Sequence, residues 1–381
     1  MDKETKELSQ EKFQRVHVED NLGEELSRPQ LSYWKDAWIR LRRNKGAIAG
    51  LFVLTFIILL ALIGPLMNDY GRDEANYDAA YLPPKVKGLE WAGLDGTQVL
   101  RLQGTSVDDA VERGLAGYSI EEQFVQDVNT VSEPDNDDPY YTVEVKVDMY
   151  EAKGFGDEYF WFGTDNMGRD LWTRIWHGTQ ISLFIGLLAA LIDMVIGVIY
   201  GGISGYYGGR TDNIMQRIIE VLSGIPNLVI VILMIIVLKP GLIAITIALT
   251  ITGWIGMARI VRGQVLKLKG QEFILAARTL GASDKGILMK HLVPNVLSVI
   301  IINTMFTIPS AIFFESFLSF IGLGLQPPIA SLGTLIDMAF DDYRVFPYML
   351  LFPAVIISLL MIGFNILADG LRDALDPKMR N

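Results

Sequence analysis

Six long apolar stretches constrain this 381-residue chain more than any other feature of its sequence. The first stretch, 46–66, contains no charged residue and is long enough to cross about 30 Å of hydrocarbon as a helix. The other five are predominantly apolar, and each is about long enough to span a bilayer. They cover 181–206, 214–238, 241–260, 296–325 and 346–368. The pattern predicts an all-α integral membrane protein with six transmembrane helices.

Charge is unevenly distributed along the chain. The whole chain carries 33 Lys and Arg against 44 Asp and Glu, a net charge of −11. Residues 67–177 alone carry nine basic and 23 acidic residues, so the acidity belongs to one insert between the first two predicted helices. The absence of cysteine excludes disulfides and Cys-ligated metal centres. Three scattered histidines and a net acidic chain indicate neither a metal site nor a nucleic-acid partner.

Basic residues flank the predicted helices asymmetrically. Residues 28–45 hold six Lys and Arg against one acid, and residues 259–291 hold seven against two. Because short cytoplasmic loops are enriched in Lys and Arg, both segments are expected inside, with the insert and the acidic loop 326–345 outside. We therefore expect a multi-pass protein of the cell membrane whose N- and C-termini are both cytoplasmic.

These boundaries divide the chain into five parts. They are a cytoplasmic tail (1–45), a first transmembrane helix (46–66), an acidic extracellular insert (67–177), a membrane core with five further helices (178–376) and a cytoplasmic C-terminus (377–381).

The insert is expected to fold as a small α+β domain. Val143, Val145 and Val147 alternate with charged residues, as in a half-buried strand. The acidic tract 133–139 lacks the glycine and the final glutamate of an EF-hand, so it is predicted to be a solvated turn. The candidate core aromatic residues are Trp91, Tyr118, Phe124 and Tyr150.

A helix–turn–helix pattern marks the cytoplasmic loop 264–292. Apolar residues recur on one helical face, Gly281 is placed to end that helix in the left-handed conformation, and Ser283 is placed to cap a second helix. The pattern predicts two short helices that form a compact projection, which either packs on its own bundle or binds a cytoplasmic partner. The residues assigned to this projection are Glu272, Phe273, Ala276, Ala277, Leu280, Gly281, Ala282, Ser283, Asp284 and Ile287.

A few residues inside the predicted spans are expected to contact another helix or a polar group. Gly197, Gly201 and Gly205 recur every four residues, so another helix is expected to approach closely there, from this subunit or from a partner subunit. Asp193 and Glu315 are acids within spans, where a carboxylate costs about 2.5–3.5 kcal/mol on insertion scales. Each is expected either to line a pore or to make a hydrogen bond inside the bundle. The second interpretation is favoured for Glu315, which follows Pro309 near a predicted outer end.

Enzyme motifs are absent from the sequence. It contains no G-x-x-x-x-G-K-[ST] phosphate loop, no H-E-x-x-H zinc motif and no G-x-S-x-G nucleophile motif. We therefore expect a non-catalytic membrane subunit that acts as a conduit or, alternatively, as a receptor or assembly scaffold through its acidic insert.

Several motifs, in the same order along the chain, resemble those of a known family. Ala276-Ala277-x3-Gly281 followed by His291-Leu-Val-Pro294 resembles the E-A-A-x3-G-x9-I-x-L-P loop of ABC importer permeases. Two positions depart from that motif: Leu275 stands at the position of the Glu, and His291 replaces the usual aliphatic residue. The segment 162–170 with 181–183, and the segments 258–263, 314–324 and 369–377, resemble the C-type permease subunit of oligopeptide and dipeptide importers. The resemblance covers roughly 34–66 and 161–378. The residues that form the motif outside the membrane are Gly163, Thr164, Asp165, Gly168, Arg169 and Asp170.

This resemblance implies a Type I ABC importer permease fold and half of a translocation channel for peptides. The implied partners are a homologous second permease subunit, two cytoplasmic ATPases that dock on the 272–291 loop, an extracellular peptide-binding protein and membrane lipid. ATP and Mg²⁺ would belong to the ATPases, and this chain would bind no cofactor. Related permeases handle nickel and other small solutes, so these remain alternative cargoes. The external motif is expected to be either a tight turn with an internal ion pair or a docking surface.

Overall fold

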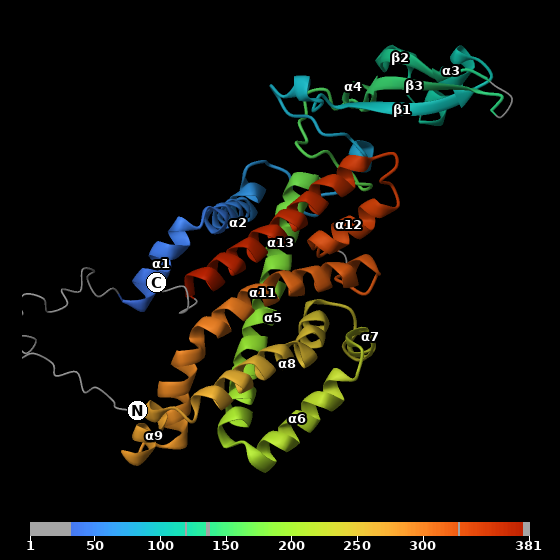
Figure 1. The fold of residues 1–381 in the computed structure, drawn as a ribbon. Helices are drawn as coiled ribbons and strands as arrows, with labels where there is room; N and C mark the ends of the chain where they lie inside the picture. Colours follow the sequence, from blue (N-terminus) through green and yellow to red (C-terminus); the bar gives the residue numbers. More distant parts are fainter. Residues whose placement is uncertain (1–31, 119, 135–137, 327, 376–381) are drawn as a thin grey trace, which may run out of the picture.

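The computed structural model of the chain describes residues 32–118, 120–134, 138–326 and 328–375. Most of the predicted N-terminal tail, the middle of the tract 133–139 and the predicted C-terminus 377–381 lie outside the described residues. Figure 1 shows a bundle of long helices with a small sheet-containing unit at one end and α9 (Glu272–Thr279) at the other.

The bundle and the insert contain the following elements. The remaining helices of the bundle are α1 (Tyr33–Arg43), α2 (Lys45–Ile63), α5 (Leu171–Tyr207), α6 (Gly209–Ser223), α7 (Asn227–Leu238), α8 (Leu242–Leu268), α10 (Asp284–Gly286), the π-helical turn η6 (Ile287–Leu292), α11 (Val293–Phe320), α12 (Leu332–Phe340) and α13 (Pro347–Leu375). The insert contains β1 (Thr97–Gly104), α3 (Val107–Gly117), β2 (Val125–Ser132), β3 (Tyr141–Asp148) and α4 (Met149–Lys153). Short 3-10 turns occur at Gly64–Leu66, Tyr77–Ala79, Glu90–Ala92 and Glu122–Phe124.

The predicted membrane character of the chain is confirmed. Within the described residues, five helical segments are long and apolar enough to cross a membrane, and a sixth crossing exists if the bent pair α6–α7 counts as one. The five segments are Lys45–Leu66, Leu171–Tyr207, Leu242–Leu268, Asp284–Phe320 and Pro347–Leu375. The expected count of six therefore depends on α6 and α7.

The bend between α6 and α7 corrects the expectation of one straight helix over 214–238. The two helices meet at 79°, with the break at Gly224–Pro226. Proline cannot donate the backbone hydrogen bond that a continuing helix requires, and it disfavours helical geometry at the residue before it, Ile225. A Gly-Ile-Pro sequence is therefore enough to end α6 and to start α7 in a new direction.

Glycines bring the two main helix pairs of the bundle close together. A Cβ at Gly201 of α5 would overlap the carbonyl of Ala258 in α8, and Gly197 and Gly205 likewise face Met257 and Val265. Within this subunit, these three glycines pack against α8. Gly50 of α2 similarly meets the backbone of α13, where its Cβ would lie 3.0 Å from the Gly363 carbonyl oxygen.

The insert folds around a three-stranded antiparallel sheet with strand order β1-β3-β2. The predicted alternation appears in β3, where Val143, Val145 and Val147 are fully buried beside Leu100 of β1. Tyr150 joins this core as expected. Trp91 and Tyr118 do not, because their side chains are 84% and 46% exposed, so the expectation for these two aromatic residues is wrong.

The insert is anchored on the end of the bundle formed by the α12–α13 connection. The Tyr81 hydroxyl donates to Asp342 Oδ2 at 3.0 Å, Gln98 Nε2 donates to the Val345 carbonyl at 3.3 Å, and the Tyr348 hydroxyl donates to the Thr164 carbonyl at 3.1 Å. Helix α5 begins at Leu171, so the last seven residues assigned to the insert, 171–177, already belong to the helix.

Candidate functional site

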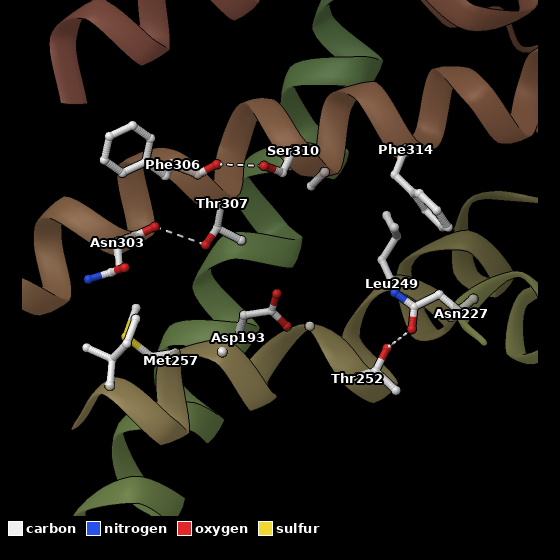
Figure 2. A pocket seen from close by; sticks show the side chains of 15 residues that line it. Asp193, Asn227, Leu249, Thr252, Met257, Asn303, Phe306, Thr307, Ser310 and Phe314 are labelled. Atoms are coloured by element: carbon white, nitrogen blue, oxygen red, sulfur yellow. Dashed lines mark hydrogen bonds between the residues drawn. The ribbon is translucent and has the colours of Figure 1, made fainter. Parts of the chain in front are cut away.

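A cavity of about 390 Å³ lies within the bundle, between α5, α7, α8 and α11. Figure 2 shows the Asp193 carboxylate of α5 pointing into this space, with side chains of α8 and α11 on either side. Asp193 is the only lining residue that carries a charge among the residues that the structure describes there. The lining residues are Asp193, Asn227, Ala248, Leu249, Thr252, Gly253, Gly256, Met257, Ile260, Asn303, Phe306, Thr307, Ser310, Ala311 and Phe314.

Asp193 lies on the same face of α5 as the glycines that pack on α8. It precedes Gly197 by four residues, which places it one helical turn along that face. Its residue exposure is 5%, and its buried Oδ1 atom has no hydrogen-bond partner among the described residues. Opposite it stands Gly253 of α8, where any side chain would overlap the carboxylate. The seam between α5 and α8 therefore opens at Asp193 into the cavity.

Most polar residues that line the cavity donate hydrogen bonds to oxygen atoms other than those of Asp193. The hydroxyls of Thr307 and Ser310 donate to the carbonyls of Asn303 and Phe306, at 3.0 and 2.9 Å. The Thr252 hydroxyl donates to Asn227 Oδ1 at 2.8 Å. Asn303 Nδ2 donates to the Val299 carbonyl at 2.7 Å, which leaves the side-chain oxygen of Asn303 as an acceptor. The cavity thus presents several acceptor atoms, together with the amide nitrogen of Asn227 as a donor, beside a carboxyl group whose Oδ1 is unpaired.

Glu315 lies outside this cavity, in a buried cluster of serines. Its Oε2 accepts from Ser182 of α5 at 3.1 Å, and its Oε1 accepts from Ser319 at 2.9 Å. Ser182 in turn accepts from the backbone N–H of Leu332 at the start of α12, at 3.2 Å. Glu315 is 0% exposed and links three helices. The two membrane acids that the sequence singled out are therefore not brought together, and they occupy different environments.

The motif 163–170 folds as a buried turn at the base of α5. The carboxylate of Asp165 pairs with the Arg169 guanidinium at 2.7 Å, and it also accepts from the backbone N–H of Arg169 at 3.0 Å. Thr164 Oγ1 bridges two backbone groups by accepting from the N–H of Leu82 and donating to the carbonyl of Ala79. Gly163 and Gly168 have φ of +76° and +70°, in the left-handed region that favours glycine.

Asp170 completes this turn as the cap of α5. Its Oδ2 atom accepts from the backbone N–H of Thr173 and from Asn68 Nδ2, both at 2.8 Å. Burial raises the pKa of the Asp170 carboxyl, against the lowering effect of these hydrogen bonds. Asp165, Arg169 and Asp170 are exposed by 5% or less, which favours the interpretation of a structural turn over that of a docking surface.

Arg174 is a buried charge that sequence reasoning missed. Its side chain is 2% exposed and lies 3.4 Å from Asp165 Oδ2 and 3.9 Å from Asp73 Oδ1. The sequence signal that could have identified Arg174 is its position four residues after Asp170, at the start of a predominantly apolar helix. Arg174 extends the charged cluster of the turn into the first turn of α5.

The loop 264–292 contains one short helix, α9, followed by a turn. Both hydrogen bonds of a Schellman motif end α9, from Ala282 N to the Ala277 carbonyl and from Gly281 N to the Arg278 carbonyl, each at 3.0 Å. Gly281 has φ +82°, and the Ser283 hydroxyl accepts from the N–H of Gly286, as predicted. The second helix is not short, because α10 continues through η6 into α11 as a single segment, Asp284–Phe320.

The predicted apolar face of α9 points away from the bundle. Phe273 is 42% and Leu280 87% exposed, and Glu272 and Ala276 are exposed as well. The helix is held instead by Ile274, which is fully buried together with Ile287 of η6. Ala277 and Ala282 are half-buried at the turn. The loop is therefore anchored through one side and leaves most of its other apolar side exposed.

The described residues contain no group of three or more His, Cys, Asp or Glu side chains arranged to hold a metal ion. The candidate functional features of the described chain are a cavity with polar and apolar lining, a buried acidic anchor at Glu315 and an exposed projection at α9.

Comparisons with known proteins agree over almost the whole chain. A family model described as binding-protein-dependent transport system inner membrane component matches residues 194–381. A second model, described as the N-terminal TM domain of oligopeptide transport permease C, matches residues 32–84.

Curated relatives extend this agreement. The chain is 42% identical to a dipeptide transport system permease protein of Bacillus subtilis, over 94% of this chain and 90% of the relative. It is 41% identical to an oligopeptide transport system permease protein of the same organism, over 94% of each. An oligopeptide transport system permease protein of Escherichia coli is 35% identical, over 95% and 96%.

Among solved structures, a chain of an inward-facing MetNI methionine ABC transporter is similar over 52% of this chain and 94% of its own length. The sequence identity is 20% and the TM-score is 0.43, so the similarity is low. The sequence identities with the curated permeases each span at least nine tenths of both proteins and show the family to which the chain belongs. The chain belongs to the family of binding-protein-dependent transport system inner membrane components.

Proposed function

We propose that this chain is a permease subunit of an ATP-driven peptide importer and forms half of its translocation channel. The observation that carries the proposal is the identity of 41–42% with oligopeptide and dipeptide permeases across 94% of the chain. The N-terminal match to an oligopeptide permease model supports the same cargo. Peptides are therefore preferred to nickel or another small solute.

The channel assignment draws on the cavity at Asp193. A transported hydrophilic molecule needs polar groups at membrane depth, and such groups are tolerated only where they line a cavity or meet a partner. The cavity between α5, α8 and α11 supplies hydroxyls, amides and one carboxylate in the apolar bundle. A second, homologous permease subunit would complete the channel opposite this half.

The α9 projection is the proposed docking site for a cytoplasmic ATPase. Leu280, Phe273 and Leu275 are 87%, 42% and 49% exposed on a helix that is anchored from its other side. Exposed apolar residues grouped on one projection are typical of interaction sites. Closure of two ATPases around ATP and Mg²⁺ would then move the attached helices as rigid bodies. This chain would transmit the work of ATP hydrolysis without binding ATP.

The proposed orientation places α9 and both termini in the cytoplasm and the insert outside the cell. It is supported by the basic segments 28–45 and 259–291 and by the position of the insert and α9 at opposite ends of the bundle. An extracellular peptide-binding protein would dock on the end that carries the insert. The alternative of a receptor acting through the insert is not favoured, because the family match covers the helices of the bundle.

Purification of the tagged chain from its native membrane tests the composition of the complex. We expect a second permease and two ATPases to co-purify, with ATP hydrolysis stimulated by a peptide-loaded binding protein. A Leu280→Asp variant should lose the ATPases while it keeps the second permease, because Leu280 is exposed on the projection. An active complex without any ATPase would contradict the proposal.

A further inference from the structure

The Asp193 carboxyl group is buried, and its Oδ1 atom has no partner among the described residues of this chain. Its exposure is 5%, its Oδ1 atom makes no hydrogen bond within the described residues, and every other residue lining the cavity is uncharged. A carboxylate at membrane depth is stable only beside a cation, a hydrogen-bond donor or water. Because the described residues supply none of these to Oδ1, the group that stabilises Asp193 is expected to come from outside this chain.

The surroundings of Asp193 specify what kind of group fits. The hydroxyls of Thr307, Ser310 and Thr252 already donate hydrogen bonds to neighbouring oxygens, so toward a bound group they can act only as acceptors. Asn303 also keeps its side-chain oxygen free of the hydrogen bond that its amide nitrogen makes. Several acceptors and one carboxylate in the same cavity match a primary ammonium group, which carries one positive charge and three donors.

The cavity has room for more than an inorganic ion. Its volume of about 390 Å³ lies within the range of about 300–1,000 Å³ that is typical of small-molecule sites. Phe306 and Phe314 add apolar surface on the α11 side, as Figure 2 shows. The site therefore suits a small molecule that combines an ammonium group with apolar parts.

We propose that Asp193 binds the primary ammonium group of a peptide in transit through the channel. The ammonium is either the peptide N-terminus or a lysine side chain, which are chemically the same donor. This inference rests on the proposed function and names a contact that such a channel would make. Gly253 and Gly197 support it, because the close α5–α8 seam holds the carboxylate at the edge of the cavity.

The test uses the complete complex in proteoliposomes, with one binding protein saturated in turn by three labelled dipeptides. They are Ala-Phe, N-acetyl-Ala-Phe and N-acetyl-Lys-Phe. For each peptide, maximal uptake is compared between the wild-type complex and Asp193→Asn, so the preference of the binding protein itself cancels. We expect Asp193→Asn to lower uptake of Ala-Phe at least about fivefold more than uptake of N-acetyl-Ala-Phe. N-acetyl-Lys-Phe follows Ala-Phe if a lysine ammonium also binds, and follows N-acetyl-Ala-Phe if only the N-terminus does.

Two further variants separate the possible results. Asp193→Glu keeps the charge and should keep the preference for a free ammonium, and Glu315→Gln, outside the cavity, should leave the wild-type ratio between peptides unchanged. An equal loss for Ala-Phe and N-acetyl-Ala-Phe in Asp193→Asn overturns the inference. Failure of Asp193→Asn to assemble with the second permease also overturns it, because the partner of the carboxylate would then lie on that subunit. A wild-type complex that imports none of the peptides refutes the proposed function instead.

Discussion

The Tyr206 hydroxyl donates a 2.6 Å hydrogen bond to Asp284 Oδ1, and it accepts one from the Arg278 guanidinium at 3.2 Å. Arg278 lies before the Gly281 turn and Asp284 after it, so one tyrosine at the end of α5 ties both sides of the α9 projection. Helix α5 also carries Asp193. A displacement of α9 by an ATPase would therefore reach the helix that lines the cavity.

Replacing Tyr206 by Phe tests this connection. The variant keeps the ring, which packs against neighbouring residues, but it loses both hydrogen bonds to the loop. We expect the number of peptides imported per ATP hydrolysed to fall a few-fold, with little change in the amount of assembled complex. Tyr207→Phe, an exposed neighbour, is the matched control. An unchanged ratio of uptake to hydrolysis in Tyr206→Phe would show that the tie does not transmit motion.

Gly281→Leu tests the turn itself. Gly281 has φ +82°, and in this left-handed conformation a leucine would raise the free energy of the folded protein by about 1–2 kcal/mol. The turn also sets the direction of α9 relative to α11. The variant should insert and assemble but lose stimulation of ATP hydrolysis by the loaded binding protein. Gly270→Leu, at a glycine with open space before α9, should retain stimulation. Full stimulation in Gly281→Leu would rule out a role of the turn in coupling.

Gly201→Leu tests the seam between α5 and α8. Even a methyl group at this position would overlap the Ala258 carbonyl, so the helices must separate. Overpacking of this kind costs about 1–3 kcal/mol or more, and we expect a lower melting temperature and less folded protein in the membrane. Gly263→Leu, at a position of α8 with no neighbour within 4 Å, serves as the control. Equal melting temperatures for the two variants would contradict the close approach.

Glu315 distinguishes an anchor from a pore residue. Glu315→Leu leaves the hydroxyls of Ser182 and Ser319 without their acceptor, at a cost of about 1–3 kcal/mol for each buried group, whereas Glu315→Gln keeps one acceptor oxygen. The Leu variant should therefore melt well below the Gln variant. A pore residue would behave differently: both variants would melt like the wild type and lose uptake.

Asp165→Asn separates the two interpretations of the external motif. Removing one charge from the buried pair with Arg169 should lower the free energy of unfolding by about 3–5 kcal/mol, which a thermal melt detects. Asp157→Asn, at an exposed position of the same insert, should melt like the wild type. If Asp165→Asn instead kept its stability and weakened only the encounter with the binding protein, the motif would be a docking surface.

The strongest local signals in the sequence correspond to real elements. Uncharged runs such as 46–66 became helices because a continuous apolar surface can be satisfied only in the membrane or in a core. The alternation around Val145 became β3, and Gly281 and Ser283 took the backbone positions that their chemistry favours. Each of these signals lies within a few residues of the element that it predicts.

Other features depended on neighbours distant in sequence. Trp91 was expected in the core of the insert, but other residues, among them Val145 and Tyr150, form that core and Trp91 is exposed. The apolar face of α9 was visible in the sequence, yet only the structure shows that Ile274 anchors the helix while Leu280 points outward. The Gly-Ile-Pro sequence at 224–226 is a local signal for the bend, but the length of the apolar run 214–238 led to the prediction of one helix.

The candidate site was predictable only in part. Asp193 could be singled out as an acid within a span, but the residues of α8 and α11 that line the cavity with it lie more than 50 residues away in sequence. Glu315 gave the same sequence signal and turned out to be hydrogen-bonded by Ser182 and Ser319. The difference between a satisfied and an unsatisfied acid is a property of packing, which no local pattern contains.

Uptake of a labelled dipeptide by cells that lack this gene tests whether this chain is needed for peptide import. We expect uptake to fall to background in the deletion strain, to return with the wild-type gene, and not to return with the gene for Gly281→Leu. Unchanged peptide uptake in the deletion strain, with a loss of nickel uptake in its place, would contradict the account.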